Sequence, residues 1–550
     1  MANGALPAYL ASAQPNPVTN RAPWYKNTAQ AYAGIFLWIA FYDALAGTDA
    51  GPGALGMSGL GMCLLALVAA GLISYALFYL VPGMLGMKTG YPLYIVGTST
   101  FGTKGGYFLP GIFMGLLQIG WYSVATFYAT KLVLNGLGYS QYDNTLFGPP
   151  AAGGNEFSLV FVLLAVGWGY LFAFLGGLGI GTVAKVSTYF PVIPIIMLIG
   201  GGILAASHLK NYDRAEATQR SLAAISALDA VEETATTAAK LVGKPEAEAK
   251  AAGAEARRAM AKETADAAVL DSAPLGDGAQ AMASGMSWPG FLLVIQLVIG
   301  FFATAGACGA DFCSNNRDAR DVRMGGLVGV ALATLFAGGL AIIAVAGAHG
   351  LQAERLAAGE ATLGELIPYN FAGALPALSP QLGNYMLILF AVGSVAPACF
   401  CSFIIGNSLS TMLARPKARV PITMAGATIG IVLAALGVAG NLGAFFGLIG
   451  ASFGPVLGAM AADYLLSGKK WAGPRAGISI PGYAAWAIGF AVGVSNNGFL
   501  FGAEPPVPGW VPTSVLSMFV GFVVYAILAK AGLESKVVQM PTAAAQPSEA

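Results

Sequence analysis

The sequence predicts an all-α protein that crosses a membrane many times. Of its 550 residues, 56% are hydrophobic and only 10% are charged, and the mean hydropathy is +0.69. Soluble domains carry about 25% charged residues, so this composition indicates an integral membrane protein. Long apolar stretches recur along the chain, and a helix needs about 20 such residues to span a bilayer. Because backbone polar groups find no water in lipid, we expect these stretches to be helical.

Twelve stretches satisfy this criterion, and we expect the first and the eleventh to be the shortest spans. In chain order they are residues 32–47, 57–81, 108–133, 157–176, 186–206, 289–310, 325–347, 385–412, 422–439, 444–466, 483–499 and 511–528.

The distribution of Lys and Arg predicts the orientation of the spans. Short cytoplasmic loops of membrane proteins collect basic residues. Here the even-numbered connections and both tails carry most of the basic residues, whereas the short odd-numbered connections carry only Lys131 and Arg355. This asymmetry favours an even number of spans, with both termini on the cytoplasmic side of the inner cell membrane.

The segment 207–287, between the fifth and sixth spans, is long, polar and rich in alanine. Its clearest break is Gly243-Lys244-Pro245, so the composition favours two helices joined by a turn. By the same parity the insert lies outside the cell, because long outer segments are translocated whatever their charge. Two interpretations stay open: a hairpin that caps the bundle, or a docking module for a partner.

Two spans contain residues that interrupt an apolar helix. In the sixth span, residues 300–311 combine small residues, a hydroxyl and a carboxylate, and we expect the helix to unwind at Gly300; the first span places Asp43 among apolar residues. Broken spans in corresponding positions of two inverted repeats form the binding sites of secondary transporters. We therefore divide the chain into the segments 1–29 (tail), 30–206 (first five-helix repeat), 207–287 (insert), 288–466 (second repeat), 467–530 (two further helices) and 531–550 (tail).

Asp43 is the residue whose insertion into lipid is most costly. A carboxylate at the centre of a helix costs about 2.5–3.5 kcal/mol on insertion scales, so it normally faces a cavity or a partner. Asp43 is therefore our candidate for ion coupling, either by carrying a proton or by holding a cation together with a backbone carbonyl such as that of Ala40. The alternative is that the helix ends earlier and Asp43 lies in an outer vestibule.

The third and sixth spans carry groups that suit a planar heterocycle. Gln118 and Trp121 lie three residues apart and share one helical face, which offers an amide and a flat aromatic ring. In the sixth span, Phe302 or its neighbour Phe301 adds a second ring and Thr304 a hydroxyl. The alternative is that the Trp belongs to the interfacial aromatic belt and the Gln packs between helices.

The eighth span is unusually polar, and Ser402 and Asn407 are its candidate site residues. Such residues either wall a site or bond neighbouring helices. The rest of the chain excludes several functions. We find no nucleophile–base pair, phosphate loop or metal cluster, so we predict no enzymatic activity and no cofactor. A net charge of +1 makes nucleic acid an improbable partner, and the five cysteines fit buried apolar positions.

Six motifs occur along the chain: GFFATAGACGADF at 300–312, NRDA at 316–319, NRAPWY at 20–25, FGPV at 453–456, AADY at 461–464 and AAWAIG at 484–489. Taken together, these motifs resemble the nucleobase–cation symporter family, which includes the cytosine, purine, allantoin and hydantoin permeases. The resemblance implies a LeuT-like fold of five plus five helices with two more, alternating access, and symport with Na⁺ or H⁺.

The resemblance also implies roles for the candidate residues. Trp121 and Phe302 would stack a base, while Gln118, Thr304 and the backbone of Gly300 would bond its edge. Three further substrate contacts would come from Trp38, Ser402 and Asn407.

We therefore expect an importer of a nucleobase or related heterocyclic amide. Two alternatives stay open. The same fold can carry an amino acid or an amine, with Asp43 as the opposing charge. The chain can also be a sensor or scaffold that has lost transport and uses the outer insert to bind a partner.

Overall fold

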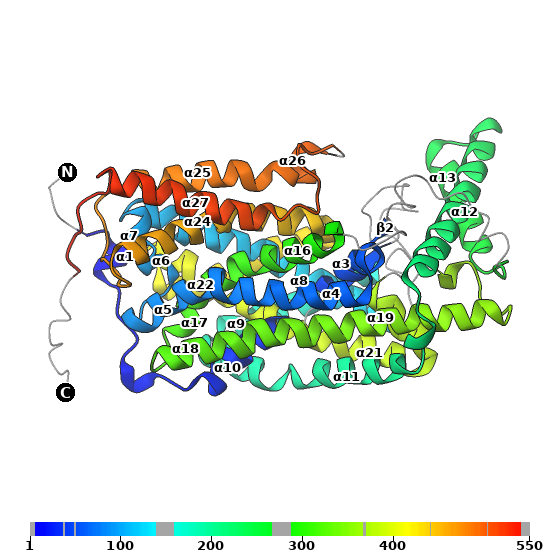
Figure 1. Cartoon of the computed structure of the whole chain (residues 1–550), viewed down its shortest axis with the longest axis horizontal. Helices are drawn as coiled ribbons and strands as arrows, with labels where there is room; N and C mark the ends of the chain where they lie inside the picture. The colour runs from blue at the N-terminus through cyan, green and yellow to red at the C-terminus, as the bar shows by residue number, and fades with distance from the viewer. Residues whose placement is uncertain are drawn as a thin grey trace.

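Long helices run side by side along the molecule, and the first and last described segments of the chain lie at the same end of this bundle (Figure 1). We call it the terminal end, and the opposite end the insert end. The computed structural model describes residues 6–36, 39–48, 51–138, 159–266, 288–366, 370–440, 442–502 and 504–540.

The first half of the bundle begins with short helices and continues with long ones. Its helices are α1 (Ala8–Ala11), α2 (Thr28–Phe36), α3 (Ile39–Ala46), α4 (Ala54–Ile73), α5 (Leu80–Thr89), α6 (Leu93–Val96), α7 (Thr98–Phe101), α8 (Met114–Gly136), α9 (Leu159–Gly177), α10 (Ile180–Tyr189) and α11 (Val192–Ala206). π-Helical stretches join α4 to α5 and lead into α8. The strands β1 (Gly47–Thr48) and β2 (Gly51–Pro52) form a small antiparallel pair.

The second half has the same general form. Its helices are α16 (Trp288–Ala307), α17 (Gly309–Cys313), α18 (Ala319–Gly326), α19 (Ala333–Ala357), α20 (Phe371–Leu378), α21 (Pro380–Gly393), α22 (Val395–Met412), α23 (Arg419–Ala435), α24 (Leu442–Leu466), α25 (Ile480–Gly493), α26 (Gly498–Phe501) and α27 (Thr513–Lys530).

Ten helical stretches within the described residues are long and apolar enough to cross a membrane. They are Ala54–Thr89, Tyr107–Gly136, Leu159–Gly177, Gly181–Ala206, Trp288–Ala307, Ala319–Ala357, Pro380–Met412, Pro416–Ala435, Phe445–Leu466 and Thr513–Lys530. The two remaining predicted spans are the ones expected to be shortest: α2 and α3 flank residues 37 and 38, and α25 has 14 residues. The total of twelve spans therefore stays a prediction.

The sixth span is broken, but not where the sequence analysis expected. The prediction that the helix unwinds at Gly300 is wrong, because α16 is continuous to Ala307 and the break falls at Cys308. Gly300 serves close packing instead: a Cβ there would lie 2.7 Å from the backbone oxygen of Phe446 in α24. At the true break, the Tyr32 hydroxyl donates to the Ala305 carbonyl at 2.8 Å. That bond satisfies an acceptor that the end of a helix leaves without an intrahelical partner.

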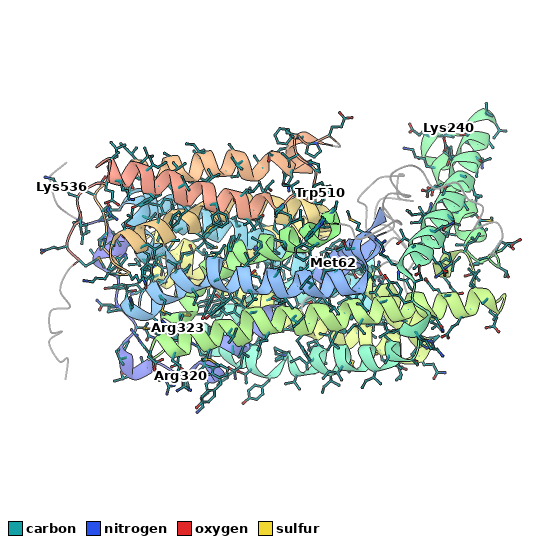
Figure 2. All side chains as sticks on the ribbon, in the orientation of Figure 1. Met62, Lys240, Arg320, Arg323, Trp510 and Lys536 are labelled. Atoms are coloured by element: carbon teal, nitrogen blue, oxygen red, sulfur yellow. The ribbon has the colours of Figure 1, made fainter. Side chains whose placement is uncertain are left out.

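The insert stands at the end opposite to the termini (Figure 1). It contains α12 (Arg214–Leu241) and α13 (Glu246–Met260), which pack against each other. Figure 2 shows Lys240 on this insert, whereas Arg320, Arg323 and Lys536 lie toward the terminal end. The Arg214 guanidinium donates to the Met57 carbonyl at 2.9 Å, which ties the base of α12 to α4.

At the terminal end, the segment after α27 returns to the bundle. Its backbone pairs with the loop before α25, since the amide of Ala476 donates to the Lys536 carbonyl at 2.9 Å. Beneath this pairing, the Arg475 guanidinium contacts the carboxylates of Asp463 and Glu534, each at 2.8 Å. The side chains of Arg475 and Asp463 are only 5% and 6% exposed, so the tail closes over a buried ion pair.

Candidate substrate site

Helices α8, α16 and α22 approach one another in the middle of the bundle (Figure 1) and enclose a small cavity. Each helix contributes residues spaced by three or four positions, which places them on one helical face. The lining residues are Gln118, Trp121 and Ala125 from α8, Phe301, Thr304 and Ala305 from α16, and Pro397, Phe400 and Cys401 from α22.

Trp121 and Thr304 form the polar centre of this cavity. The indole Nε1–H of Trp121 donates to the Thr304 hydroxyl at 2.8 Å, and the two residues are 4% and 1% exposed. The Phe301 and Phe445 rings lie nearly perpendicular to the Trp121 ring, at centroid distances of 5.4 and 5.1 Å, and the Phe446 ring is tilted against it. Because an indole has one hydrogen-bond donor, the bond to Thr304 fixes which way this ring faces.

Gln118 provides the second polar group. Its amide Nε2 donates to the sulfur of Met114 at 3.5 Å. A thioether is a weak acceptor, so a ligand carbonyl can replace it with little loss. The Thr304 hydroxyl is similarly available, because its own contact with the Phe301 carbonyl is long, at 3.5 Å.

The cavity is closed in this conformation. Its volume is about 20 Å³, which is close to the smallest space that holds one water molecule. Small-molecule pockets usually measure about 300–1,000 Å³. On the side of the terminal end, the rings of Phe400 and Phe312 are stacked with centroids 4.7 Å apart. A heterocycle can therefore enter only after at least one of the surrounding rings has moved.

The other predicted contacts lie away from this cavity. Phe302 is buried beside Phe301, with centroids 5.1 Å apart, and does not belong to the lining. The Ser402 hydroxyl donates to the Phe172 carbonyl of α9 at 3.1 Å, as expected of a residue that bonds neighbouring helices. Asn407 lines a second small cavity nearer the terminal end.

Asp43 lies near the insert end, in α3. It is 4% exposed, and its carboxylate accepts a hydrogen bond from the backbone amide of Ala372 at 3.2 Å. Ala372 is in the first turn of α20, where an anion interacts favourably with the helix dipole. Asp43 thus links α3 to α20. Trp38 and the side chain of Ala40 lie outside the described residues.

Three lining residues, Phe400, Ala125 and Ala305, escaped the sequence analysis. Phe400 comes from the eighth span, where the analysis had favoured polar residues. The signal that could have found them is periodicity, since three or four positions separate residues on one face. On the other two helices the same spacing leads from Trp121 to Ala125 and from Thr304 to Phe301.

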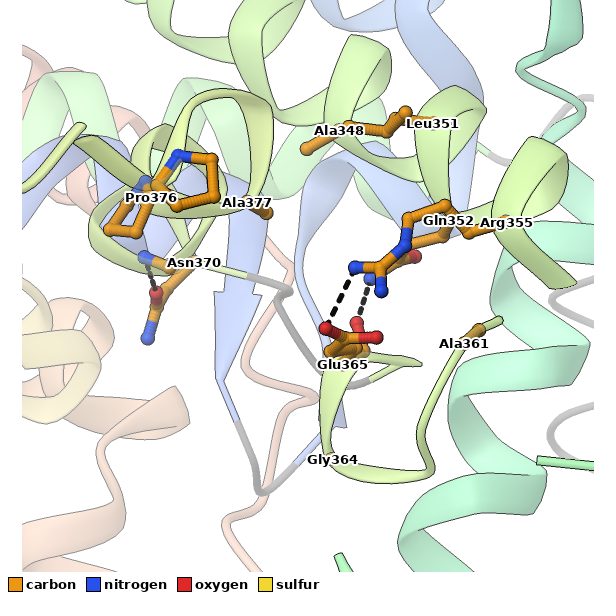
Figure 3. Close-up of a pocket in the computed structure, with 12 residues that line it drawn as sticks. Ala348, Leu351, Gln352, Arg355, Ala361, Gly364, Glu365, Asn370, Pro376 and Ala377 are labelled. Carbon is orange, nitrogen blue, oxygen red and sulfur yellow. Dashed lines mark hydrogen bonds and ion pairs between the residues drawn. The ribbon is translucent and has the colours of Figure 1, made fainter. Parts of the chain in front are cut away.

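A larger cavity of about 430 Å³ lies between α19, α20 and the segment that joins them (Figure 3). Its polar groups are engaged with one another. Arg355 forms an ion pair with Glu365 at 2.7 Å, and the Gln352 amide donates to the Glu365 carbonyl. The Asn370 side chain accepts from the Gly373 amide at 2.6 Å. These contacts fix the connection between α19 and α20.

Within the described residues there is no group of three or more His, Cys, Asp or Glu side chains that could hold a metal ion. The two histidines are engaged elsewhere. His208 contacts the Glu354 carboxylate at 2.9 Å, and His349 contacts the Gln352 side chain at 2.8 Å.

No protein-family profile matches the chain, and no curated protein matches it in sequence. Solved structures do resemble it. Mhp1, a nucleobase-cation-symport-1 family transporter, in a closed conformation with bromovinylhydantoin bound, has a TM-score of 0.55 at 16% identity, over 96% of this chain and 98% of that one. Mhp1 in its inward facing conformation has a TM-score of 0.53 at 14% identity, over 96% and 97%. This likeness confirms the predicted LeuT-like fold class, which the chain shares with a transporter of the family that its motifs resemble.

Proposed function

We propose that the chain is a secondary active transporter that imports a nucleobase or related heterocyclic amide by symport with Na⁺ or H⁺. The observation that carries this proposal is the enclosed site of Trp121, Thr304 and Gln118, where three helices of a transporter fold meet. The fold likeness to Mhp1 supports it, because that protein is described with bromovinylhydantoin, a cyclic amide, bound.

The polar groups of the site complement an amide edge. The Thr304 hydroxyl and the Gln118 amide nitrogen can each donate to a ring carbonyl, and the Gln118 oxygen can accept from a neighbouring ring N–H. Trp121 offers a flat face against which a planar ring packs. In the structure, the Phe301 and Phe445 rings pack against the indole and the cavity is small, so a surrounding ring must move before the substrate can stack on the indole.

Both the ring and the polar contacts are needed for useful affinity. A base of about eight heavy atoms reaches at most about 12 kcal/mol, at a ceiling near 1.5 kcal/mol per atom. Micromolar binding requires about 8 kcal/mol. On the driving side, one charge that crosses about 100 mV supplies ~2.3 kcal/mol, which corresponds to about fifty-fold accumulation. A single coupled ion is therefore sufficient for import.

The composition of the cavity supports a neutral heterocycle over an amino acid. Its lining contains no charged side chain, and transfer of an ionised carboxylate or ammonium group into such a site is very costly without a partner. Asp43, the predicted opposing charge for an amine, is held against α20 instead. The roles of Asp43 and Ala40 in ion coupling stay predictions, and Trp38, Phe302, Ser402, Asn407 and the Gly300 backbone remain predicted contacts.

A binding panel tests the proposal. Radiolabelled cytosine, uracil, hypoxanthine and allantoin are offered to the purified protein, together with a set of amino acids. At least one heterocyclic amide should bind and should be competed by the others. Binding should weaken in Thr304→Val but not in Thr334→Val, a buried threonine of α19 outside the cavity. Binding of amino acids alone would refute the proposed substrate class.

A further inference from the structure

A second carboxylate, Asp311, lies in α17 just beyond the break in the sixth span. One of its oxygens accepts from the backbone amide of Leu93 at 3.3 Å. The carboxylate also borders a cavity of about 10 Å³, close to the smallest that holds a water molecule. The cavity is lined by Leu93, Tyr94, Pro110, Met114, Asp311, Ile404, Asn407 and Ser408.

Among the residues that the structure describes, this carboxylate has no cationic partner. The nearby Arg317 forms its ion pair with Asp321, at 2.8 Å, and none of the ion pairs within the described residues includes Asp311. On the neighbouring α5, the Lys88 ammonium donates to the Lys469 carbonyl at 2.6 Å instead. A carboxylate inside a membrane protein normally pairs with another group or takes part in function.

The titratable groups around Asp311 are all neutral at ordinary pH. They are Tyr32 from α2, Tyr94 from α6 and Cys308 at the break. Helices α8 and α22 add only the uncharged side chains of the cavity lining. Desolvation without an opposing charge disfavours the ionised form of a carboxylate, so the surroundings of Asp311 favour proton uptake.

Asp311 lies between the candidate substrate site and the terminal end of the bundle. On the substrate side, Met114 lines the Asp311 cavity and also accepts the amide of Gln118, which lines the substrate site. On the other side, Tyr94 lines both the Asp311 cavity and a cavity of about 460 Å³ at the terminal end. Along α22, Cys401, Asn407 and Thr411 line the three cavities in turn.

We propose that Asp311 is the binding site of the coupling proton, so that the chain is an H⁺ symporter. The inference rests on the proposed transport function and names its coupling ion. In the outward-open form the carboxylate takes one proton from water and becomes a neutral carboxylic acid. In the inward-open form the acid releases that proton past Tyr94 and becomes a carboxylate again.

The contact between Gln118 and Met114 explains how substrate and proton are coupled. A heterocycle that bonds to the Gln118 amide removes the hydrogen bond from Met114. The Met114 side chain is then free to change position between the two cavities. The occupied substrate site and access to Asp311 are thus linked through one side chain.

The test compares Asp311→Asn with Asp311→Glu, and uses Asp321→Asn as the matched control, because Asp321 is a buried carboxylate that already has a cationic partner in Arg317. Asn keeps the acceptor for the Leu93 amide but cannot carry a proton, whereas Glu can. The proteins are placed in liposomes with the heterocycle that binds best. We then measure uptake driven by an inward proton gradient without sodium, and counterflow exchange, which needs no gradient.

We expect the Asp311→Asn protein to lose proton-driven accumulation, about fifty-fold at 100 mV, while counterflow stays within about two-fold of the parent protein. The Asp311→Glu and Asp321→Asn proteins should still accumulate substrate. Accumulation by Asp311→Asn at the parent level would overturn the inference. Loss of both counterflow and accumulation in both Asp311 variants would also overturn it, because that result indicates a structural contact with Leu93. Accumulation by the parent protein under a sodium gradient alone would overturn it as well.

A substrate-independent measurement separates this inference from the proposed function. Infrared difference spectra of the purified protein, recorded during a pH titration, should contain the carbonyl band of a protonated carboxylic acid. The band should be absent in Asp311→Asn, shifted in Asp311→Glu and retained in Asp321→Asn. If the band is assigned to Asp311 but no heterocyclic amide binds, the proposed substrate fails and the proton site stands. If the parent protein has no such band, the proton site fails.

Discussion

Thr304→Val removes the acceptor of the Trp121 indole and leaves the shape of the side chain almost unchanged. In the parent protein that N–H donates at 2.8 Å, and both residues are almost fully buried. A buried donor without a partner costs about 1–3 kcal/mol. We therefore expect the free energy of unfolding to fall by that amount, with the loss visible as a lower midpoint of thermal inactivation.

The same substitution also weakens substrate binding. A ring carbonyl that accepts from the Thr304 hydroxyl loses a hydrogen bond worth about 0.5–1.5 kcal/mol, which raises Kd by about 2–13-fold. Thr304→Ser keeps the hydroxyl and should stay within about three-fold of the parent Kd.

Equilibrium binding of the best heterocycle to the detergent-purified protein measures the change in Kd. Thermal inactivation of the same samples measures the change in stability. Thr334→Val is the control for substituting a buried threonine, because the Thr334 hydroxyl bonds the Val330 carbonyl outside the cavity. If Thr304→Val leaves Kd and stability unchanged, or if Thr334→Val raises Kd equally, the role of Thr304 is refuted.

Three further predictions concern the stability of the bundle and the role of the insert. Gly300→Ala places a Cβ 2.7 Å from a carbonyl oxygen of α24 and should lower the free energy of unfolding by about 1–3 kcal/mol. The control Gly167→Ala, whose Cβ would have nothing within 4 Å, should leave it unchanged. Equal midpoints of thermal inactivation for the two variants would contradict this prediction. Asp463→Asn breaks the buried pair with Arg475 and should cost about 3 kcal/mol, measured as the shift in thermal inactivation; no shift would show that the pair is dispensable. Deletion of residues 233–252 shortens the hairpin of α12 and α13 at its tip and should leave uptake unchanged; loss of uptake by a folded variant would favour the docking-module interpretation.

The fold class follows from the sequence because hydropathy and the lengths of the apolar stretches are local properties. The position of the break in the sixth span does not. Gly300 was expected to unwind because glycine tolerates unusual backbone conformations, yet its missing side chain serves the approach of α24. Whether a glycine unwinds a helix or allows close packing depends here on α24, a helix more than a hundred residues away. A local sequence pattern does not indicate which role applies.

Only part of the candidate site, likewise, could be predicted from the sequence. Trp121 and Thr304 stood out by chemistry, and the structure brings them together although 183 residues separate them. The apolar wall from α22 was missed because polar residues were favoured there. Asp311 is followed in the sequence by Arg317, Arg320 and Arg323, but Arg317 pairs with Asp321, four residues further along the chain. Which of two carboxylates pairs with an arginine depends on their distances in the folded structure, and the sequence alone does not give those distances.

The ion pair under the C-terminal segment constrains the order in which the protein can mature. Of the two carboxylates that pair with Arg475, Asp463 precedes it in the chain and Glu534 follows it, after α27. During synthesis the loop that carries Arg475 is therefore complete before its second partner exists. Glu534 lies 59 residues after Arg475, so the buried guanidinium has both of its carboxylate partners only after α27 has been synthesised.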